Sequence, residues 1–286
     1  MKKLNAKRSF CFMHHIRRKV FVFITAVLAA CFFPFQLWGE GLSAENDVSD
    51  YWKNHRTWII DNFKNERPSS WGMSLNGVIT RADTKDNLIA LTLDACDGRA
   101  GGYDAELIDF LVENGIPATL FISGLWIDAN KETFLTLASN QLFELGNHGV
   151  RHKPLSVTGR KAYGIKGTDD VGSVYDEVEE NAQKIEALTG QRPLFFRSGT
   201  AHYDDVAVRV VYALGYKAAG FSVNGDLGGT AVASKVKEAI LSMRSGEIIL
   251  LHMNRPGSGT LSGLIQAVPL MKNLGFVFVK LSELVK

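Results

Sequence analysis

The sequence has 286 residues, of which 46% are hydrophobic and 22% are charged, a composition typical of a globular protein with one large domain or two small ones. Its formal charge of +2 hides an uneven distribution, because residues 1–44 contain seven basic side chains and one acidic side chain. Removing them leaves 25 basic and 29 acidic side chains in residues 45–286, a formal charge of −4 without a block of like charge. Nucleic-acid binding therefore has no electrostatic support, and we expect no nucleic-acid partner.

Residues 1–44 have the pattern of an export signal or an N-terminal anchor. A basic stretch precedes an apolar run over residues 20–38. Three fates stay open: cleavage after Ala44, lipidation of Cys31, or retention of the run as a membrane anchor. In each case we expect an exported protein, either periplasmic or attached to the membrane through its N-terminus and facing the periplasm or the exterior.

Beyond residue 44 we expect a lead segment, residues 45–86, followed by a main domain, residues 87–286. The cysteines are Cys11, Cys31 and Cys96, and only Cys96 lies beyond residue 44. An intrachain disulfide is therefore excluded from the mature part. A domain of this size can build its core without one.

The main domain alternates short apolar runs with amphipathic segments. Apolar runs of four to eight residues indicate strands, and hydrophobic residues at helical spacing indicate helices. In chain order we expect strand 87–94, helix 104–114, strand 118–122, helix 133–138, strand 142–147, a polar glycine-containing loop 159–172, helix 171–188, strand 194–197, helix 204–214, strand 216–221, helix 232–243, strand 247–252, helix 261–274 and strand 276–279. About seven strands separated by helices predict an α/β fold with parallel strands, either a barrel or a doubly wound sheet.

Reactive side chains follow the strands of this pattern. Each of five lies at or just beyond the carboxyl end of an expected strand, namely Asp94, His148, Arg197, Asp226 and His252. In a (β/α) barrel the carboxyl ends of the strands form one face, and that face carries the chemistry. We therefore expect the five side chains to converge.

The ligand types of a metal site are present among and beside them. His148 and His152 are four residues apart and can point at one ion. Asp94 and Asp97 close an earlier apolar run and can face the histidines. Imidazole and carboxylate ligands with a spare carboxylate as base are the parts of metal-assisted hydrolysis.

In their order, these motifs resemble those of the polysaccharide deacetylases, the NodB-homology domain of carbohydrate esterase family 4. The resemblance covers residues 87–281 through five motifs, which read here Thr92-Leu93-Asp94-Ala95, His148-Gly149-Val150-Arg151-His152, Arg197-Ser198-Gly199-Thr200, Ser222-Val223-Asn224-Gly225-Asp226 and Leu250-Leu251-His252. It implies a distorted (β/α) barrel of about seven parallel strands. It also implies a metal-dependent enzyme that removes acetyl groups from N-acetylated sugars.

The resemblance also implies catalytic roles. Asp94 occupies the position of the base and His252 that of the general acid. Arg197 would pair with Asp94 and hold it ionised, since a nearby cation lowers a carboxylate pKa. Asp226 would orient His252.

For the metal and the oxyanion, the sequence departs from the family pattern at several points. His148 and His152 match the metal-ligand positions, but Ala95 replaces the second Asp of the first motif. Either Asp97 supplies the missing ligand, or Asp97 forms a turn and Asp94 itself binds the metal. Imidazole ligands favour a divalent transition metal, most of all zinc, with cobalt or nickel as alternatives. The third motif is shortened and lacks its proline, and backbone N–H groups at Gly199 and Thr200 would help to hold an oxyanion.

We therefore expect a metal-dependent hydrolase that removes N-acetyl groups from an envelope or extracellular polysaccharide and releases acetate. Three alternatives stay open. The same chemistry could act on a non-sugar amide, or Ala95 and Ser198 could mark a catalytically silent carbohydrate-binding domain. A thiol hydrolase using Cys96 is disfavoured, because we expect Asp94 and Asp97 to raise the pKa of its thiol.

Overall fold

The computed structural model describes residues 40–96 and 102–286. The chain divides into two compact units, residues 1–50 and residues 51–286. Of the first unit only the start of helix α1 (Glu40–Phe63) is described, so the apolar run of the expected export segment and Cys31 lie outside the described residues. Within residues 40–96 and 102–286, no helix is both long enough and apolar enough to cross a membrane.

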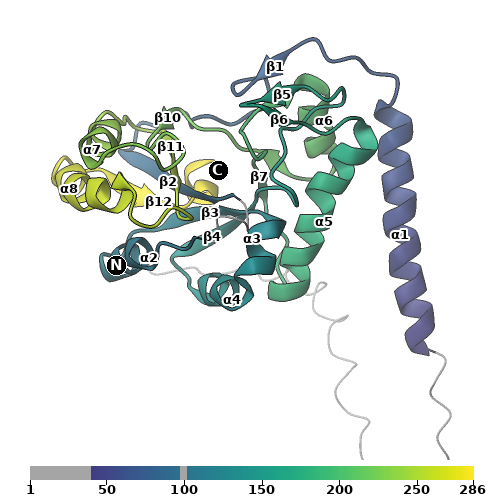
Figure 1. Ribbon diagram of the computed structural model, residues 1–286, viewed down its shortest axis with the longest axis horizontal. Coiled ribbons are helices and arrows are strands. Elements are labelled where there is room, and N and C mark those ends of the chain that lie inside the picture. The colour runs from purple at the N-terminus through teal and green to yellow at the C-terminus, as the bar shows by residue number, and fades with distance from the viewer. Residues whose placement is uncertain (1–39, 97–101) are drawn as a thin grey trace, which may run out of the picture. The chain divides into compact units, whose positions relative to one another are not determined.

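The second unit is an α/β structure built around one curled sheet (Figure 1). The strands of this sheet are β2 (Leu88–Ala95), β3 (Ala118–Ile122), β4 (Phe143–Asn147), β7 (Phe195–Phe196), β9 (Lys217–Ala218), β10 (Val223–Asn224), β11 (Ile248–His252) and β12 (Val277–Val279). The helices that follow α1 are α2 (Ala105–Glu113), α3 (Gly124–Ala129), α4 (Lys131–Ser139), α5 (Val171–Thr189), α6 (Asp205–Ala213), α7 (Ala233–Leu241), α8 (Gly259–Asn273) and α9 (Leu281–Leu284).

The strands are ordered β10-β11-β2-β3-β4-β7-β9, and β12 pairs with the first residues of β2. Every pairing in this sheet is parallel. Seven parallel strands along a curled sheet, connected by helices, confirm the expected α/β fold of the distorted-barrel type. A parallel arrangement brings the carboxyl ends of all these strands to one edge.

Side-chain hydrogen bonds fix where several helices begin. Asp104 accepts a hydrogen bond from the Leu107 N–H at the start of α2, and Ser123 accepts one from the Trp126 N–H at the start of α3. Asp170 and Ser173 form a reciprocal capping box at the start of α5. These side chains satisfy N–H groups that have no partner within the helix.

Strand β2 separates two different environments. Leu91, Leu93 and Ala95 are fully buried in a large apolar cluster that also contains residues of α2, α7 and α8. Ala90 belongs to a smaller cluster with Phe121, Phe195 and residues of α9. Because side chains alternate along a strand, Thr92 and Asp94 share the face of Ala90.

Part of the expected lead segment belongs to the same compact unit as the sheet. Ile59 of α1 is fully buried in a cluster with residues of α5 and α6. Arg56 binds Asp176 of α5 through two hydrogen bonds of 2.7 and 2.9 Å. The helical residues after position 50 therefore pack as part of the domain.

The structure differs from the sequence-based elements mainly at the sheet edge. The strands expected at 194–197 and 216–221 are reduced to the two-residue strands β7 and β9, and β10 was not predicted. The polar loop expected at 159–172 contains a short antiparallel pair, β5 (Lys161–Ala162) and β6 (Ile165–Lys166). A second antiparallel pair joins β1 (Trp71–Gly72) and β8 (Tyr203–Asp204). Pairings this short depend on neighbouring chain segments, so hydrophobic periodicity does not reveal them.

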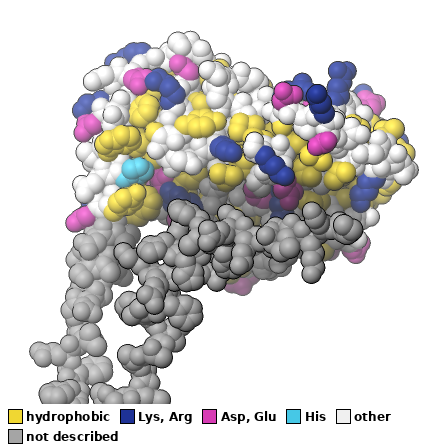
Figure 2. Space-filling model, turned by 180° about the vertical axis from the view of Figure 1, so that it is seen from behind, with side chains coloured by type: hydrophobic (Ala, Val, Ile, Leu, Met, Phe, Trp, Pro, Cys, Tyr) yellow, Lys and Arg dark blue, Asp and Glu magenta, His cyan; other side chains and the backbone are white. Residues whose placement is uncertain are grey.

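One face of the molecule shows how the charged side chains are distributed over it. On the face shown in Figure 2, basic and acidic side chains are interspersed rather than gathered by sign. That face offers no extended basic track for a nucleic-acid backbone.

Candidate active site

The reactive side chains predicted from the sequence meet at the carboxyl edge of the sheet. His252, the last residue of β11, lies opposite Asp94 in the register of β11 against β2. His148 follows β4, and Arg197 follows β7, whose residue Phe196 is paired with Asn147. The strand order therefore places the ends of β11, β4 and β7 at the same edge of the sheet as Asp94.

Asp94 and Arg197 form a buried ion pair. Arg197 Nη1 lies 2.7 Å from Asp94 Oδ1 and 2.9 Å from Thr92 Oγ1, and Arg197 Nη2 donates to the Gly220 carbonyl at 2.8 Å. The guanidinium carbon of Arg197 lies 4.1 Å from the centre of the Phe121 ring. These contacts hold the arginine in one orientation behind the carboxylate.

This environment controls the charge of Asp94. Burial alone raises the pKa of a carboxyl group, because it disfavours the charged form. Here the positive charge of Arg197 leads the interactions that outweigh burial and hold the pKa of Asp94 below its ordinary value. Asp94 is therefore an anion over the range in which most enzymes work.

His252 and Asp226 form the second pair. His252 Nδ1 lies 2.8 Å from Asp226 Oδ1, and the His252 backbone N–H donates to Asp226 Oδ2 at 2.7 Å. Thr260 Oγ1, which the sequence did not single out, donates to Asp226 Oδ2 at 3.0 Å. Burial lowers the pKa of His252, but the hydrogen bonds with Asp226 and Cys96 reverse this and raise its pKa well above 6.5.

His148 and His152 offer unpartnered nitrogens to the same region. Their ring centres are 4.9 Å apart, and Nε2 of each is buried without a hydrogen-bond partner among the described residues. His148 Nδ1 lies 2.9 Å from the Arg197 carbonyl, so this nitrogen carries the proton and Nε2 keeps its lone pair. His148 Nε2 lies 3.4 Å from Asp94 Oδ2. Burying polar nitrogens without partners is costly unless a ligand uses them.

Cys96 joins the two histidines. One ligand atom from each of Cys96, His148 and His152 lies within 4.8 Å of the other two. Ala95, which replaces the family's carboxylate, points to the apolar cluster instead, and Asp97 lies outside the described residues. The donor set that the described residues bring together is therefore two nitrogens and one sulfur, which fits a divalent transition metal.

The expected direction of the pKa shift of the Cys96 thiol was wrong. Burial raises the pKa of the Cys96 thiol, but its interactions with the imidazoles of His148, His152 and His252 outweigh burial and hold the pKa well below its ordinary value. The sequence places acidic residues beside Cys96, whereas the fold brings imidazoles from β11 and from the segment after β4 close to its sulfur.

Glu177 of α5 supports the histidine segment and was not found from the sequence. It accepts hydrogen bonds from the backbone N–H groups of Arg151 at 3.0 Å and Lys153 at 3.1 Å. A Cβ on Gly149, which has a φ of 77°, would collide with the Glu177 carboxylate. Burial raises the pKa of Glu177 to about 7 despite the two N–H donors. Gly149 therefore makes room for a buried glutamate.

Gly199 has a different environment from the one expected. Its N–H donates to the Lys153 carbonyl at 3.1 Å, so that group is not available to an oxyanion in this structure. A Cβ at Gly199 would collide with the backbone of His152, which shows that glycine permits a close approach of two loops. Thr200 lies beside it, and its Oγ1 is buried without a partner among the described residues. Of the two expected oxyanion positions, Thr200 retains an unused polar group.

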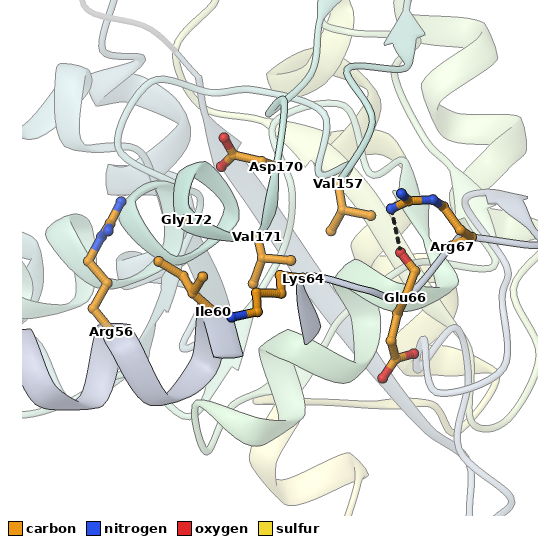
Figure 3. Close-up of a pocket in the computed structure, with 9 residues that line it drawn as sticks. All are labelled: Arg56, Ile60, Lys64, Glu66, Arg67, Val157, Asp170, Val171 and Gly172. Carbon is orange, nitrogen blue, oxygen red and sulfur yellow. Dashed lines mark hydrogen bonds between the residues drawn. The ribbon is translucent and has the colours of Figure 1, made fainter. Parts of the chain in front are cut away.

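A cavity of about 440 Å³ is lined by other residues (Figure 3). Arg56 and Ile60 of α1 and Lys64, which follows α1, line it together with Val171 at the start of α5. Arg56 is paired with Asp176 and Lys64 with Asp61. This cavity contains none of the side chains that converge at the carboxyl edge, and we assign no chemistry to it.

Comparisons with known proteins agree with this architecture. A family model described as polysaccharide deacetylase matches residues 81–219, a range that includes Asp94, both histidines of the His148 segment and Arg197. The chain is similar to a peptidoglycan-N-acetylglucosamine deacetylase of Bacillus cereus, with 25% identity over 205 residues that cover 70% of this chain and 89% of the relative. It is also similar to a chitooligosaccharide deacetylase of Sinorhizobium fredii, with 24% identity over 218 residues that cover 72% of this chain and 95% of the relative.

Solved structures show the same fold. A peptidoglycan N-acetylglucosamine deacetylase superposes with a TM-score of 0.62 and 20% identity, over 73% of this chain and 92% of that chain. A CE4-family pseudoenzyme from Bacillus anthracis superposes with a TM-score of 0.61 and 20% identity, over 72% of this chain and 68% of that chain. The fold thus occurs in a protein called a deacetylase and in one called a pseudoenzyme, so function must be argued from the site.

Proposed function

The chain belongs to the polysaccharide deacetylase family, and on this premise we propose that it hydrolyses N-acetyl groups of an envelope or extracellular polysaccharide and releases acetate. One observation carries the proposal. The Asp94–Arg197 and His252–Asp226 pairs meet at one sheet edge beside the unpartnered nitrogens of His148 and His152. A base, an acid and a set of metal ligands are thereby present together.

Asp94 acts as the general base in this proposal. Arg197 holds Oδ1 and keeps the carboxyl group ionised, while Oδ2 is on the side of His148. Oδ2 takes a proton from the attacking water as the water adds to the acetyl carbonyl. Arg197 is a positioning residue, because its donors are directed at Asp94, Thr92 and a backbone carbonyl rather than at solvent.

His252 acts as the general acid. Its Nδ1 is held by Asp226, which leaves Nε2 to donate a proton to the sugar nitrogen as the amide bond breaks. The raised pKa of His252 keeps the ring protonated for this step. The lowered pKa of Asp94 and the raised pKa of His252 give the separated acid and base that the reaction requires.

His148 and His152 would hold a divalent metal, with zinc favoured and cobalt or nickel as alternatives. The two buried Nε2 atoms without partners support this assignment. When bound, such an ion would polarise the acetyl carbonyl and lower the pKa of the attacking water.

Both partners are present in the Asp94–Arg197 pair and in the His252–Asp226 pair, which favours catalysis over carbohydrate binding without catalysis. Arg197 and Asp94 are in contact, as are His252 and Asp226, although Ala95 departs from the family motif. A sugar-binding domain has no need of a buried acid and base with opposed pKa shifts. The similarity to two glycan deacetylases favours an N-acetylated glycan over a non-sugar amide.

We also propose that the chain is exported and acts in the periplasm or at the outer side of the membrane. The basic stretch followed by the apolar run at residues 20–38 supports export. N-acetylated glycans of the envelope are accessible from that side.

Acetate release by the full-length chain tests the proposed function. The protein is stripped with a chelator, reloaded with zinc or cobalt, and assayed on peptidoglycan and on N-acetylglucosamine oligomers. We expect release to disappear on stripping and to return with metal. Absence of release from every N-acetylated glycan with every metal would refute deacetylation and leave the silent binding domain.

A further inference from the structure

The unusual feature of this site is the residue that lies where a carboxylate ligand is expected. Ala95 is fully buried in the apolar cluster on the far face of β2, so a carboxylate at this position would be directed away from the histidines. Cys96 is the next residue along the chain. Side chains alternate between faces, so Cys96 returns to the face of Asp94.

Resting on the proposed function, we propose that the Cys96 thiolate is the third protein ligand of the metal, which makes the centre a two-histidine, one-cysteine site. The Cys96 sulfur and one nitrogen each from His148 and His152 lie within 4.8 Å of one another. A single ion with bonds of about 2.3 Å to sulfur and about 2.0 Å to nitrogen joins such a group after small side-chain rotations. Both Nε2 atoms are buried without another partner.

The backbone of Cys96 is held in place independently of any ion. Ser123, which begins α3, donates from Oγ to the Cys96 carbonyl. The Ser123 N–H donates to the Ala95 carbonyl at 3.1 Å. His148 is fixed from the other side by the Arg197 carbonyl. Cys96 and His148 therefore face each other from the ends of β2 and β4, and hydrogen bonds to Ser123 and to the Arg197 carbonyl hold them in place.

This ligand set changes which metals suit the site. Sulfur is a soft donor that selects zinc and cobalt over magnesium, calcium and manganese, which prefer oxygen. Three protein ligands leave a position open, as in catalytic zinc sites. Asp94 then remains free as the base, because Arg197 already holds one of its oxygens.

Absorption of the cobalt-loaded protein tests the ligand directly. Thiolate bound to cobalt(II) gives a near-ultraviolet charge-transfer band that imidazole and carboxylate do not give. Because Cys11 and Cys31 are also thiols, the full-length chain carries Cys11→Ser and Cys31→Ser in every sample. We expect the band in this background, and we expect zinc to abolish it by displacing cobalt. Absence of the band from cobalt-loaded protein would overturn the proposal.

Three variants separate ligation from other roles of Cys96. Cys96→Ala should lose the band and weaken zinc binding by about a hundredfold or more, since even outer contacts change affinity 10–100-fold. Cys96→Asp should lose the band, bind zinc and retain turnover within about tenfold, because a carboxylate is also a zinc ligand. Asp97→Asn should keep the band. Circular dichroism of each variant verifies folding, and zinc affinity unchanged in folded Cys96→Ala would overturn the proposal.

Activity measured on the same samples keeps the two proposals distinguishable. The band without acetate release supports the cysteine ligand and refutes the deacetylase function. Acetate release without the band supports the function and refutes the ligand. Loss of turnover in a zinc-binding Cys96→Asp variant, together with absence of the band from the cobalt-loaded parent, would indicate a nucleophilic thiol and overturn the ligand role.

Discussion

The two faces of strand β2 have different roles: one packs in the hydrophobic core and the other forms part of the candidate active site. Leu91, Leu93 and Ala95 are buried in an apolar cluster to which several helices contribute, and this face stabilises the sheet. The opposite face carries Thr92 and Asp94, which contact Arg197. Neighbouring positions of one strand therefore tolerate different substitutions. Side chains alternate along the strand, so one position lies in the core and the next in the site.

Removing the charge of Asp94 should have the largest effect on activity. Asp94→Asn eliminates the base and leaves Arg197 buried beside a neutral amide. We expect turnover to fall by about 10²–10⁴-fold. Acetate release and a thermal melt on the same sample separate lost chemistry from lost folding. The exposed Asp109→Asn serves as control, and turnover of folded Asp94→Asn near that control would contradict the assigned base.

A carboxylate on the other face should disrupt the fold. Ala95→Asp restores the family motif by letter, but it places a charge in the apolar cluster. We expect a loss of about 3–5 kcal/mol in the free energy of unfolding, because an unpaired charge is buried. Denaturant unfolding measures it, with Cys96→Asp as the matched variant one residue away. Equal stability of the two variants would show that the faces are not separated as described.

Glu177 predicts a pH-dependent stability. Its pKa is raised from 4.5 to about 7 in the folded state, so its contribution is fully present below pH 4.5 and is lost as the pH rises through 7. Relative to Glu177→Gln, the wild-type free energy of unfolding should fall by about 3 kcal/mol across this window. Denaturant unfolding at several pH values measures the difference, and Glu180→Gln, on the exposed side of α5, is the control. A difference in unfolding free energy that does not change with pH would contradict the raised pKa of the buried Glu177 carboxyl group.

The smallest expected effect is a shift in the pH dependence of kcat/KM when Asp226 is replaced by asparagine. The rate should fall at high pH as His252 loses its proton, and this fall should lie well above pH 6.5 because the pKa of His252 is raised. Asp226→Asn removes the main group that raises this pKa, so the fall should move to lower pH by about one unit. The pH dependence of kcat/KM measures it. An unchanged alkaline limb would exclude Asp226 as the partner that sets the acid.

The sequence predicted the part of the site that follows long apolar runs. Asp94, His148 and His252 each lie at or next to the end of a strand of at least five residues, so their placement needed only the strand pattern. Glu177 could not be found in this way, because its contacts are backbone N–H groups of a loop 24 and 26 residues away. Its one sequence signal is an acidic residue on the apolar side of an amphipathic helix.

Cys96 shows a different limit. Its neighbours in sequence are acidic, and its neighbours in space are histidines from β11 and from the segment after β4. The direction of its pKa shift depends on spatial neighbours, which the strand pattern alone does not supply. The prediction of the short strands failed for the same reason: β7 and β9 were predicted too long, and β10 was not predicted. Each of these strands is defined by the strand it pairs with rather than by its own residues.

The most direct test of the account is acetate turnover measured against bound zinc in the full-length protein. Chelator-stripped protein is titrated with zinc, and acetate release from N-acetylglucosamine oligomers is recorded with the zinc content of each sample. We expect no turnover without metal, and a turnover that rises linearly with bound zinc until one equivalent per chain is reached. Turnover that is independent of zinc content, or that is absent at full occupancy, would contradict it.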